Sequence, residues 1–592
     1  MFRSMVDVLA SRAGEHPDRT AFRFLANGEA DDADVTEVSY ARLDRRSRAI
    51  GAALHERGLT GARAVLLHPP GVEFIAAYLG CLAAATVAVP GLPPQGRVLK
   101  ARAVSRVRRL IADADARVIL ATKPVIAALD AMSEHLPELD EITCLATEDI
   151  PDDAGGSWRA SDLTADSIAF LQYTSGSTSA PRGVMVTHGN LMDNQVVLSR
   201  GMGHTPEIVE EYGGELYVSW LPLYHDLGLI APVLNNLYLG GTSTLFSPLH
   251  FLQKPERWLT ALSRYRPHTS GGPNFAYELC LRDATPELVG GLDLSRWRVA
   301  LNAAEPLRAG TLRRFAETFA PAGFRAGALH PGYGLAEATL MVSGGPVGQE
   351  PRTAAAGDGA AADGEWVSCG PPGVGLTVVI ADAERRTERP EGEVGEVWVA
   401  GASVTQGYWR NARATREVFG ASLTDGRDGF LRTGDLGFLR DGELYVTGRQ
   451  KDLLVIDGRN HYPQDLELTV ETAHPAVRAG CVAAFSVAGE GDSGAGERPV
   501  VVAEVAAGAS ANASTNAAAD VADTGDASAG GAEWLGEVEA EIRGAVGRAH
   551  GLALAVVVLI EPGTVPKTSS GKIQRAAARA AHLGGTLAVV GR

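Results

Sequence analysis

Residues 173–183 read YTSGSTSAPRG and follow the apolar run SIAFLQ at 167–172. A strand that ends in a loop rich in hydroxyl groups and glycine, with one arginine, presents N–H groups, hydroxyls and a guanidinium to a polyphosphate. The loop has no G-x-x-x-x-G-K-S/T pattern, which argues against a P-loop nucleotide hydrolase. Taken alone, it fits an ordinary Ser/Thr/Gly turn equally well. If it binds phosphate, the contacts come from Thr174, Ser175, Gly176, Ser177, Thr178 and Arg182.

The sequence around this loop changes its pattern twice along the chain. Residues 40–150 and 165–340 alternate helical periodicity with short apolar runs, which is typical of α/β units around a largely parallel sheet. From about 365 to 447, short strands separated by turn residues predict a β-rich subdomain. Mixed α/β patterning returns after Asp452, except at 506–532, which is nearly all small and polar residues and predicts a flexible loop.

Composition excludes several classes of protein. With 592 residues, 45% of them hydrophobic, the chain is neither disordered nor a single small module. A formal net charge of −17 argues against nucleic acid or an anionic membrane surface as the main partner. Five scattered cysteines without a C-x-x-C pair fit a reducing compartment. The N-terminus lacks the apolar core of a secretory signal, so a cytoplasmic protein is expected.

Two other patterns are set aside. The most apolar long stretch, 71–90, contains Glu73 and predicts a buried helix followed by a core strand, so no membrane span is expected. A G-x-G-x-x-G match at 489–494 is followed by a strand pattern instead of a helix, which predicts a hairpin loop and no dinucleotide site.

Five further motifs follow the hydroxyl-rich loop in order: NAAEP at 302–306, HPGYGLAE at 330–337, RTGD at 432–435, GRQKD at 448–452 and PKTSSGKI at 566–573. Together they resemble the adenylate-forming superfamily, which includes acyl-CoA synthetases, fatty acyl-AMP ligases, luciferases and the adenylation domains of peptide synthetases. The fold class expected is α/β, with a large N-terminal domain of two α/β subdomains plus a small β-rich subdomain, and a smaller, mobile α+β C-terminal domain. The expected limits are 1–448, a hinge at 449–452, and 453–592.

The resemblance implies that a carboxylate attacks the α-phosphate of ATP with the help of Mg²⁺. It implies adenine contacts from Ala303, Ala304, Glu305, Pro306, Tyr333 and Gly334, and ribose contacts from Asp435 and Arg449. Glu337 would hold the metal, which offsets charge developing on pyrophosphate. One departure is Ala336, where many relatives carry threonine; the missing hydroxyl could change the metal shell.

Two lysines acquire roles from the same resemblance. Lys572 would reach into the site and bridge the substrate carboxylate and the α-phosphate, where an ammonium neutralises two anions that must approach each other. Read without the family, a lysine in a Ser/Gly loop is usually solvated. Lys451 matches the hinge about which the C-terminal domain would rotate between half-reactions.

Three segments favour one branch of the superfamily: SWLPLYHDLGLI at 219–230, GGPNFAYELC at 271–280 and GRNHYPQDLE at 458–467. They resemble fatty acyl-AMP ligases, which pass the acyl group to the phosphopantetheine thiol of a holo acyl carrier protein. His225 would gate the carboxylate site as a catalytic residue. Apolar composition also suits a tunnel for an alkyl chain, although composition alone fits a plain core. The fatty-acid contacts expected are Trp220, Tyr224, Gly228, Leu229, Ile230, Asn274 and Phe275.

Two alternatives remain open. An acyl-CoA synthetase is one, because the segment 344–364, where adenylate-only ligases carry an insertion, is short and rich in Ala and Gly. A catalytically silent acyl- or nucleotide-binding regulator is the other. An acidic enzyme that meets an acidic carrier protein needs a basic docking patch, for which RVRR at 106–109 is a candidate, unless it is only a solvated helix face.

Overall fold

The computed structural model describes residues 2–31, 34–94, 101–131, 136–174, 181–354, 365–456, 459–488, 497–506, 527–568 and 571–590. Several predictions lie outside these ranges. They are the four loop positions Ser175, Gly176, Ser177 and Thr178, the match at 489–494, and most of the segment 506–532.

The first half of the chain builds two largely parallel sheets. The strands of the first sheet are buried on both faces. Continuous apolar runs such as VILA are typical of a sheet that helices cover on both sides. Its order is β6-β5-β3-β4-β7-β8, with only the last pair antiparallel. The strands are β3 (Arg63–Leu67), β4 (Val87–Pro90), β5 (Val118–Ala121), β6 (Thr143–Ala146), β7 (Ile168–Thr174) and β8 (Arg182–Thr187).

The second sheet has the order β14-β13-β12-β11-β9-β10-β1-β2, antiparallel only at its two edges. A shared apolar cluster joins it to the first sheet, with residues such as Phe22 and Phe170 fully buried. The strands are β1 (Thr20–Leu25), β2 (Val35–Ser39), β9 (Glu215–Ser219), β10 (Thr242–Phe246), β11 (Thr269–Gly272), β12 (Val299–Asn302), β13 (Leu329–Gly334) and β14 (Met341–Gly344).

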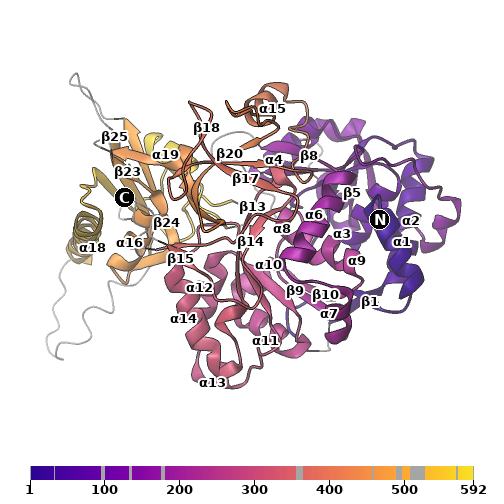
Figure 1. Cartoon of the computed structure of the whole chain (residues 1–592), viewed down its shortest axis with the longest axis horizontal. Helices are drawn as coiled ribbons and strands as arrows, with labels where there is room; N and C mark the ends of the chain where they lie inside the picture. The colour runs from indigo at the N-terminus through magenta and orange to yellow at the C-terminus, as the bar shows by residue number, and fades with distance from the viewer. Residues whose placement is uncertain are drawn as a thin grey trace.

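Helices cover both sheets (Figure 1). On one side of the second sheet, residues of α10, α11, α12 and α14 form an aromatic cluster centred on Trp258. The helices are α1 (Met5–Glu15), α2 (Tyr40–Glu56), α3 (Val72–Ala83), α4 (Ala101–Ala114), α5 (Lys123–Asp130), α6 (His188–Gly201), α7 (Pro206–Glu211), α8 (Asp226–Leu229), α9 (Asn236–Leu239), α10 (Pro248–Gln253), α11 (Glu256–Tyr265), α12 (Asn274–Arg282), α13 (Pro286–Gly290) and α14 (Ala309–Phe319).

A third, antiparallel sheet forms the β-rich part, in the order β18-β17-β19-β20-β21. A short hairpin, β15 (Thr353–Ala354) with β16 (Trp366–Val367), precedes it in the chain. The remaining elements are β17 (Thr377–Asp382), β18 (Thr387–Glu388), β19 (Gly395–Ala400), α15 (Ala412–Val418), β20 (Leu431–Arg440) and β21 (Glu443–Arg449).

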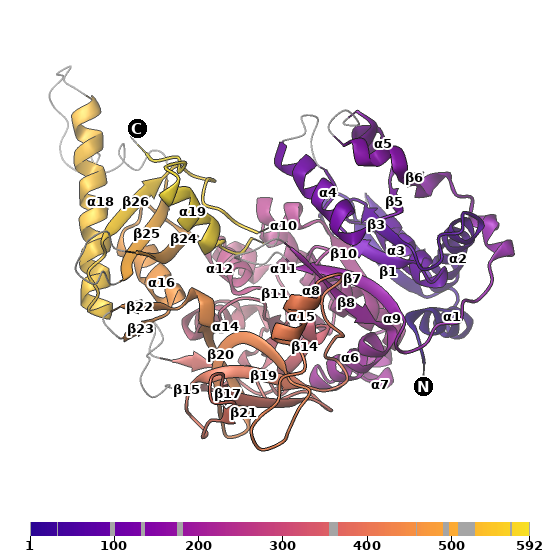
Figure 2. The same cartoon turned by 90° about the horizontal axis from the view of Figure 1, so that it is seen from above.

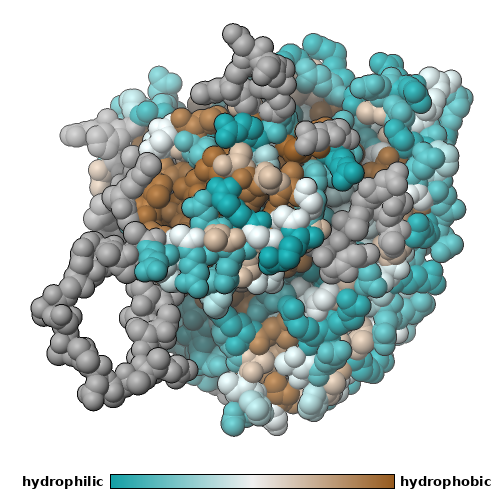
Figure 3. Space-filling model, turned by 90° about the vertical axis from the view of Figure 1, so that its left-hand side faces the viewer, coloured by the Kyte–Doolittle hydropathy of each residue, from teal (hydrophilic) through white to brown (hydrophobic). Residues whose placement is uncertain are grey.

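The last part of the chain forms a separate, smaller α+β body beside the large one, with α18 at its outer edge (Figure 2). The face that it turns away from the large domain carries hydrophobic residues surrounded by hydrophilic ones (Figure 3). The predicted fold class is therefore confirmed. The elements are β22 (Leu454–Ile456), β23 (Arg459–His461), α16 (Pro463–Ala473), β24 (Val477–Ala488), β25 (Glu497–Val505), α18 (Ala527–His550), β26 (Val556–Ile560) and α19 (Arg575–Leu583).

The apolar stretch 71–90 folds as predicted, into the buried helix α3 and the core strand β4. Within the described ranges, no helix combines the length and the apolarity needed to cross a bilayer.

Three histidines, His204, His268 and His330, are buried near one another, with His330 on β13 and His268 directly before β11 of the second sheet. Thr269 connects two of them, since its Oγ1 lies 2.7 Å from Nε2 of His204 and 2.9 Å from Nδ1 of His268. Among the described residues, neither ring nitrogen of His330 has a hydrogen-bond partner. Burial lowers the pKa of His268 and of His330 to about 4 in each case. These rings are therefore neutral in the folded protein at neutral pH.

We expect the free energy of unfolding to fall as the pH drops from about 6.5, the ordinary pKa of histidine, toward about 4. In that window the histidines of the unfolded chain become protonated, while the buried rings of the folded protein stay neutral. This difference lowers the free energy of unfolding by up to about 3 kcal/mol for each histidine. Urea denaturation of His330→Leu between pH 7.5 and 5 should show a smaller acid loss than the wild type. An equal loss in both proteins would contradict the assignment of His330.

Candidate functional site

Tyr333, Asp435 and Arg449 meet at the junction of the second and third sheets. Asp435 and Arg449 lie opposite each other in the β20–β21 register, and Arg449 Nε is 3.0 Å from Asp435 Oδ1. The Tyr333 hydroxyl donates to the other carboxylate oxygen at 2.7 Å. The Asp435 carboxylate raises the pKa of Arg449 even though burial opposes the rise. Three residues from separate motifs thus form one connected, oriented group.

The predicted adenine loop leaves the end of β12 in a strained conformation. Ala304 has φ of +75°, in the left-handed region that a residue with a Cβ rarely adopts. Such backbone costs about 1–3 kcal/mol and is concentrated at functional sites. Beyond it, Glu305 accepts a hydrogen bond from the N–H of Phe275, which ties the loop to the start of α12. Pro306 follows directly. The strain at Ala304 therefore supports a binding role for this loop.

Glu337 is held on one side by a tyrosine that no motif indicated. The hydroxyl of Tyr408 donates to Glu337 Oε1 at 2.8 Å, and the guanidinium of Arg182 lies 5.1 Å from the centre of the Tyr408 ring. Burial raises the pKa of Glu337. Across β7 and β8, Thr174 pairs with Arg182, which brings Thr174 next to this group.

Lys572 arrives at the site from the small domain. Its backbone forms a tight turn with Thr568: the Lys572 N–H donates to Thr568 Oγ1 at 3.0 Å, and the Thr568 N–H donates to the Lys572 carbonyl at 2.8 Å. Gly571 has φ of +88°, and its Cβ position is 3.6 Å from the ring of Phe275 in the large domain. This contact places the lysine loop against the predicted fatty-acid segment.

Carboxylates of the large domain act electrostatically on the ammonium group. Burial lowers the pKa of Lys572, while Asp226, Glu305 and Asp435 act in the opposite direction. His225 Nδ1 is 2.5 Å from Asp226 Oδ1. Burial alone would raise the pKa of Asp226, but His225, and Lys572 after it, outweigh burial and lower it. Asp226 is thus a charged carboxylate, and its interaction with Lys572 favours the charged form of both groups.

The predicted fatty-acid residues lie in different surroundings. Trp220 stacks on Phe251 with ring centres 3.9 Å apart and meets Phe275 edge-on at 6.0 Å, and Phe275 in turn borders the lysine loop. Leu229 and Ile230 are fully buried in the shared core. The Asn274 amide donates to Thr311 Oγ1 at 3.2 Å. The Tyr224 carbonyl accepts from Gln172 at 3.1 Å.

Gly228 is the position where the backbone leaves no room. A Cβ there would lie 2.2 Å from the Pro222 carbonyl oxygen. Gly334 is equally constrained, since a Cβ would lie 1.8 Å from the Leu340 carbonyl oxygen. Both glycines therefore allow close backbone approach next to the site.

Lys451 lies in the short turn between β21 and β22, at residues 450–452. Burial lowers its pKa, with Arg449 acting in the same direction. Its neighbour Asp452 binds Arg575, with 3.0 Å between Nη1 and Oδ2. The hinge role of Lys451 stays a prediction.

Comparison with known proteins matches a family model described as AMP-binding enzyme to residues 9–409. The chain belongs to the AMP-binding enzyme family. It is 41% identical to the medium-chain-fatty-acid–acyl-carrier-protein ligase JamA of Moorena producens, over 99% of this chain and 96% of that one. It is 36% identical to a long-chain-fatty-acid–AMP ligase of Mycolicibacterium smegmatis, over 96% and 92%.

Solved structures agree. A fatty acyl-adenylate ligase from Legionella pneumophila, in complex with acyl adenylate and pyrophosphate, is 34% identical, with a TM-score of 0.71 over 98% of this chain and 96% of that one. A structure from a study of Escherichia coli and L. pneumophila fatty acyl-adenylate ligases has a TM-score of 0.81 at 28% identity, over 99% and 98%. The resemblance to fatty acyl-AMP ligases is therefore confirmed.

We expect Gly228→Ala to lower kcat/KM for the carboxylic acid substrate about 10- to 100-fold, because the new methyl group displaces the backbone that carries His225 and Asp226. Gly14→Ala, in α1, is the matched control, since nothing lies within 4 Å of its Cβ position. Pyrophosphate release measured for both variants, with unfolding midpoints, tests this. Equal kinetics in the two variants would show that the segment tolerates the shift.

Proposed function

We propose that this protein is a fatty acyl-AMP ligase that activates a fatty acid with ATP and passes the acyl group to an acyl carrier protein. One observation carries the proposal: the loop that carries Lys572 packs through Gly571 against Phe275 of the large domain, next to the group formed by Tyr333, Asp435 and Arg449, and the carboxylates of Asp226 and Asp435 favour the charged form of Lys572. The relatives named above as fatty-acid ligases support the fatty acid as substrate.

In the first half-reaction, a carboxylate oxygen of the fatty acid attacks the α-phosphorus of ATP. The bond from that phosphorus to the oxygen shared with the β-phosphate breaks, and pyrophosphate leaves with the bonding electrons. Two anions must meet, so the Lys572 ammonium lowers the barrier by neutralising both. Asp435 and Arg449 orient the ribose, and the rings of Trp220 and Phe275 border the acyl chain. Positioning supplies much of the remaining rate.

A magnesium ion fits the surroundings of Glu337. Its buried carboxylate is an oxygen ligand of the kind that Mg²⁺ prefers, and a nearby cation would favour the charged form that burial disfavours. With Thr174 at the edge of the phosphate loop, Glu337 would hold the ion together with phosphate oxygens. When bound, the ion would offset the charge that develops on pyrophosphate.

Two observations bear on the acceptor. The hairpin strand β16, which follows the short segment 344–364, packs Trp366 edge-on against Tyr462 of the small domain at 5.4 Å. This contact supports a restraint on the small domain, as expected for a ligase that does not use CoA. The proposed docking patch at 106–109 is only partly available, because Arg106 is half-buried and Arg108 binds Glu138 at 3.2 Å.

The reaction products show whether CoA or a carrier protein accepts the acyl group. Mass spectrometry after incubation with ATP, Mg²⁺ and fatty acids of graded chain length, with CoA or with a holo carrier protein, should show acyl-AMP that persists beside CoA and disappears when the carrier protein is added. Acyl-CoA as the main product would establish the alternative acyl-CoA synthetase. Absence of pyrophosphate with every acid would favour the silent regulator.

Lys572→Ala should reduce acyl-AMP formation at least about 1,000-fold, because alanine cannot neutralise the carboxylate and the phosphate that must approach each other. ATP binding, measured by calorimetry, should stay within about threefold, since the ribose and adenine contacts come from other residues. Lys123→Ala is the matched control, because Lys123 is exposed and pairs with Asp149 at the surface. Near-normal turnover of Lys572→Ala would overturn the assignment.

A further inference from the structure

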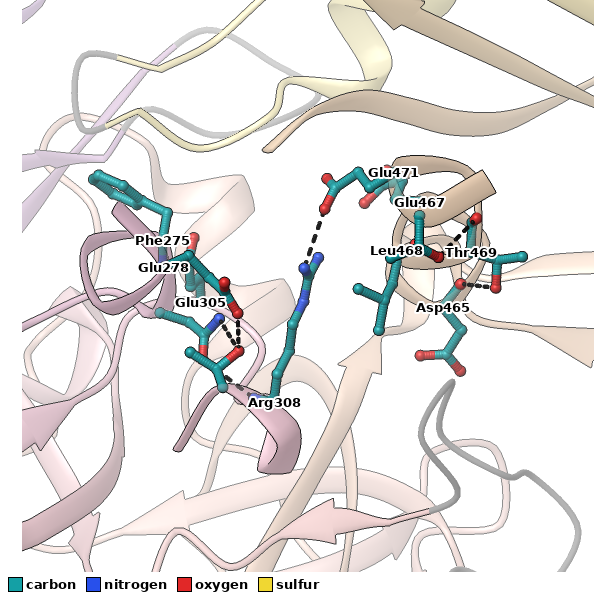
Figure 4. Close-up of polar contacts among 12 residues, drawn as sticks. Phe275, Glu278, Glu305, Arg308, Asp465, Glu467, Leu468, Thr469 and Glu471 are labelled. Atoms are coloured by element: carbon teal, nitrogen blue, oxygen red, sulfur yellow. Dashed lines mark hydrogen bonds and ion pairs between the residues drawn. The ribbon is translucent and has the colours of Figure 1, made fainter. Parts of the chain in front are cut away.

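One ion pair joins the two domains directly beside the site. Arg308 lies at the start of α14, two residues after Pro306, and its Nη1 is 3.1 Å from Oε2 of Glu471 on α16. The Arg308 side chain is 26% exposed and that of Glu471 only 7%. Figure 4 shows the arginine extending from the large domain to α16 of the small one.

The large-domain end of this pair is fixed by its backbone. The Arg308 N–H donates to Asn274 Oδ1 at 3.3 Å, and Asn274 in turn donates to Thr311 on α14. Asn274 also precedes Phe275, whose N–H is bound by Glu305 of the adenine loop. The guanidinium is therefore presented from the same framework that holds the adenine loop and the edge of the acyl site.

The small-domain end is connected to the lysine loop. One turn before Glu471 on α16, Glu467 binds Arg575 through both carboxylate oxygens, at 2.7 and 2.8 Å. Arg575 follows Lys572 by three residues and also binds Asp452, next to the predicted hinge residue Lys451. A contact that fixes α16 thus fixes the loop that carries Lys572.

We propose that Arg308 is a positioning residue for adenylation, which acts by holding Glu471 so that the small domain keeps Lys572 in the site. The inference rests on the proposed function. A buried ion pair that loses one partner leaves an unpaired charge in a poorly solvated place, which is strongly unfavourable. Removing Arg308 should therefore favour orientations in which Glu471 reaches water and Lys572 leaves the site.

The test separates the two half-reactions. Arg308→Ala should lower kcat for fatty-acid-dependent pyrophosphate release at least about tenfold, with KM for ATP unchanged within about twofold. Transfer from supplied acyl-AMP to a holo carrier protein should stay within about twofold of wild type, because that step does not need Lys572 in place. Arg308→Glu and Glu471→Arg should each be impaired, and the double variant should recover most of the adenylation rate.

Two further variants test whether the effect is specific to the ion pair of Arg308 with Glu471. Arg313→Ala removes an arginine from the same helix, exposed and paired with Glu365, and should leave both half-reactions unchanged. Glu471→Gln preserves shape if the alanine variant unfolds, and it should show the same split between half-reactions. Equal loss in both half-reactions, or no recovery in the charge-swapped double variant, would overturn the role of Arg308. A wild-type protein that forms no acyl-AMP would instead overturn the proposed function.

Discussion

The site depends on a buried positive charge supplied from another domain. Burial of an ammonium group is costly, and here Asp226, Glu305 and Asp435 offset part of that cost, although burial still lowers the pKa of Lys572. Each comes from a different motif, on a different part of the large domain. No one of them would attract Lys572 strongly, but together they define the place where its loop must dock. The proposed reaction needs a positive charge at this place, and the carboxylates of the site favour a positive charge at the same place.

Close backbone packing prepares the place where that charge docks. Gly272 leaves room for the Trp220 ring, because a Cβ there would lie 2.7 Å from it. Trp220 is then held flat against Phe251 and edge-on to Phe275, and Phe275 meets Gly571 of the lysine loop. The predicted acyl side of the site and the loop that carries Lys572 therefore share one contact surface. Rigid aromatic packing of this kind positions reacting groups without a further cost in side-chain entropy.

Sequence patterns predicted the fold class and the motif residues because both depend on local features. Alternating apolar runs predicted the parallel sheets, and Lys572, Glu337, Asp435 and Arg449 all belong to motifs. Tyr408, Glu471 and Arg575 were missed because their roles arise only when distant elements meet. Asn274 was predicted as a substrate contact, and that stays a prediction; the structure adds that its side chain also supports the Arg308 backbone and α14, which its motif did not indicate. A motif indicates where a site lies, but it does not show whether a given side chain contacts the ligand or supports the neighbouring backbone.

The contacts between the domains change in character with distance from the predicted hinge. Near it, Tyr462 packs on Trp366 and Gln464 donates to the Thr447 carbonyl at 2.6 Å, contacts that a small rotation can preserve. Farther out, the contacts include the ion pair of Arg308 with Glu471 as well as the packing of Phe275 on the lysine loop. Ion pairs suit an interface that must open, since water replaces the partner when they separate, whereas separated apolar surfaces receive no such compensation. If the small domain rotates about the predicted hinge, its two orientations can lie close in free energy, and a bound ligand with a modest preference is then enough to select one.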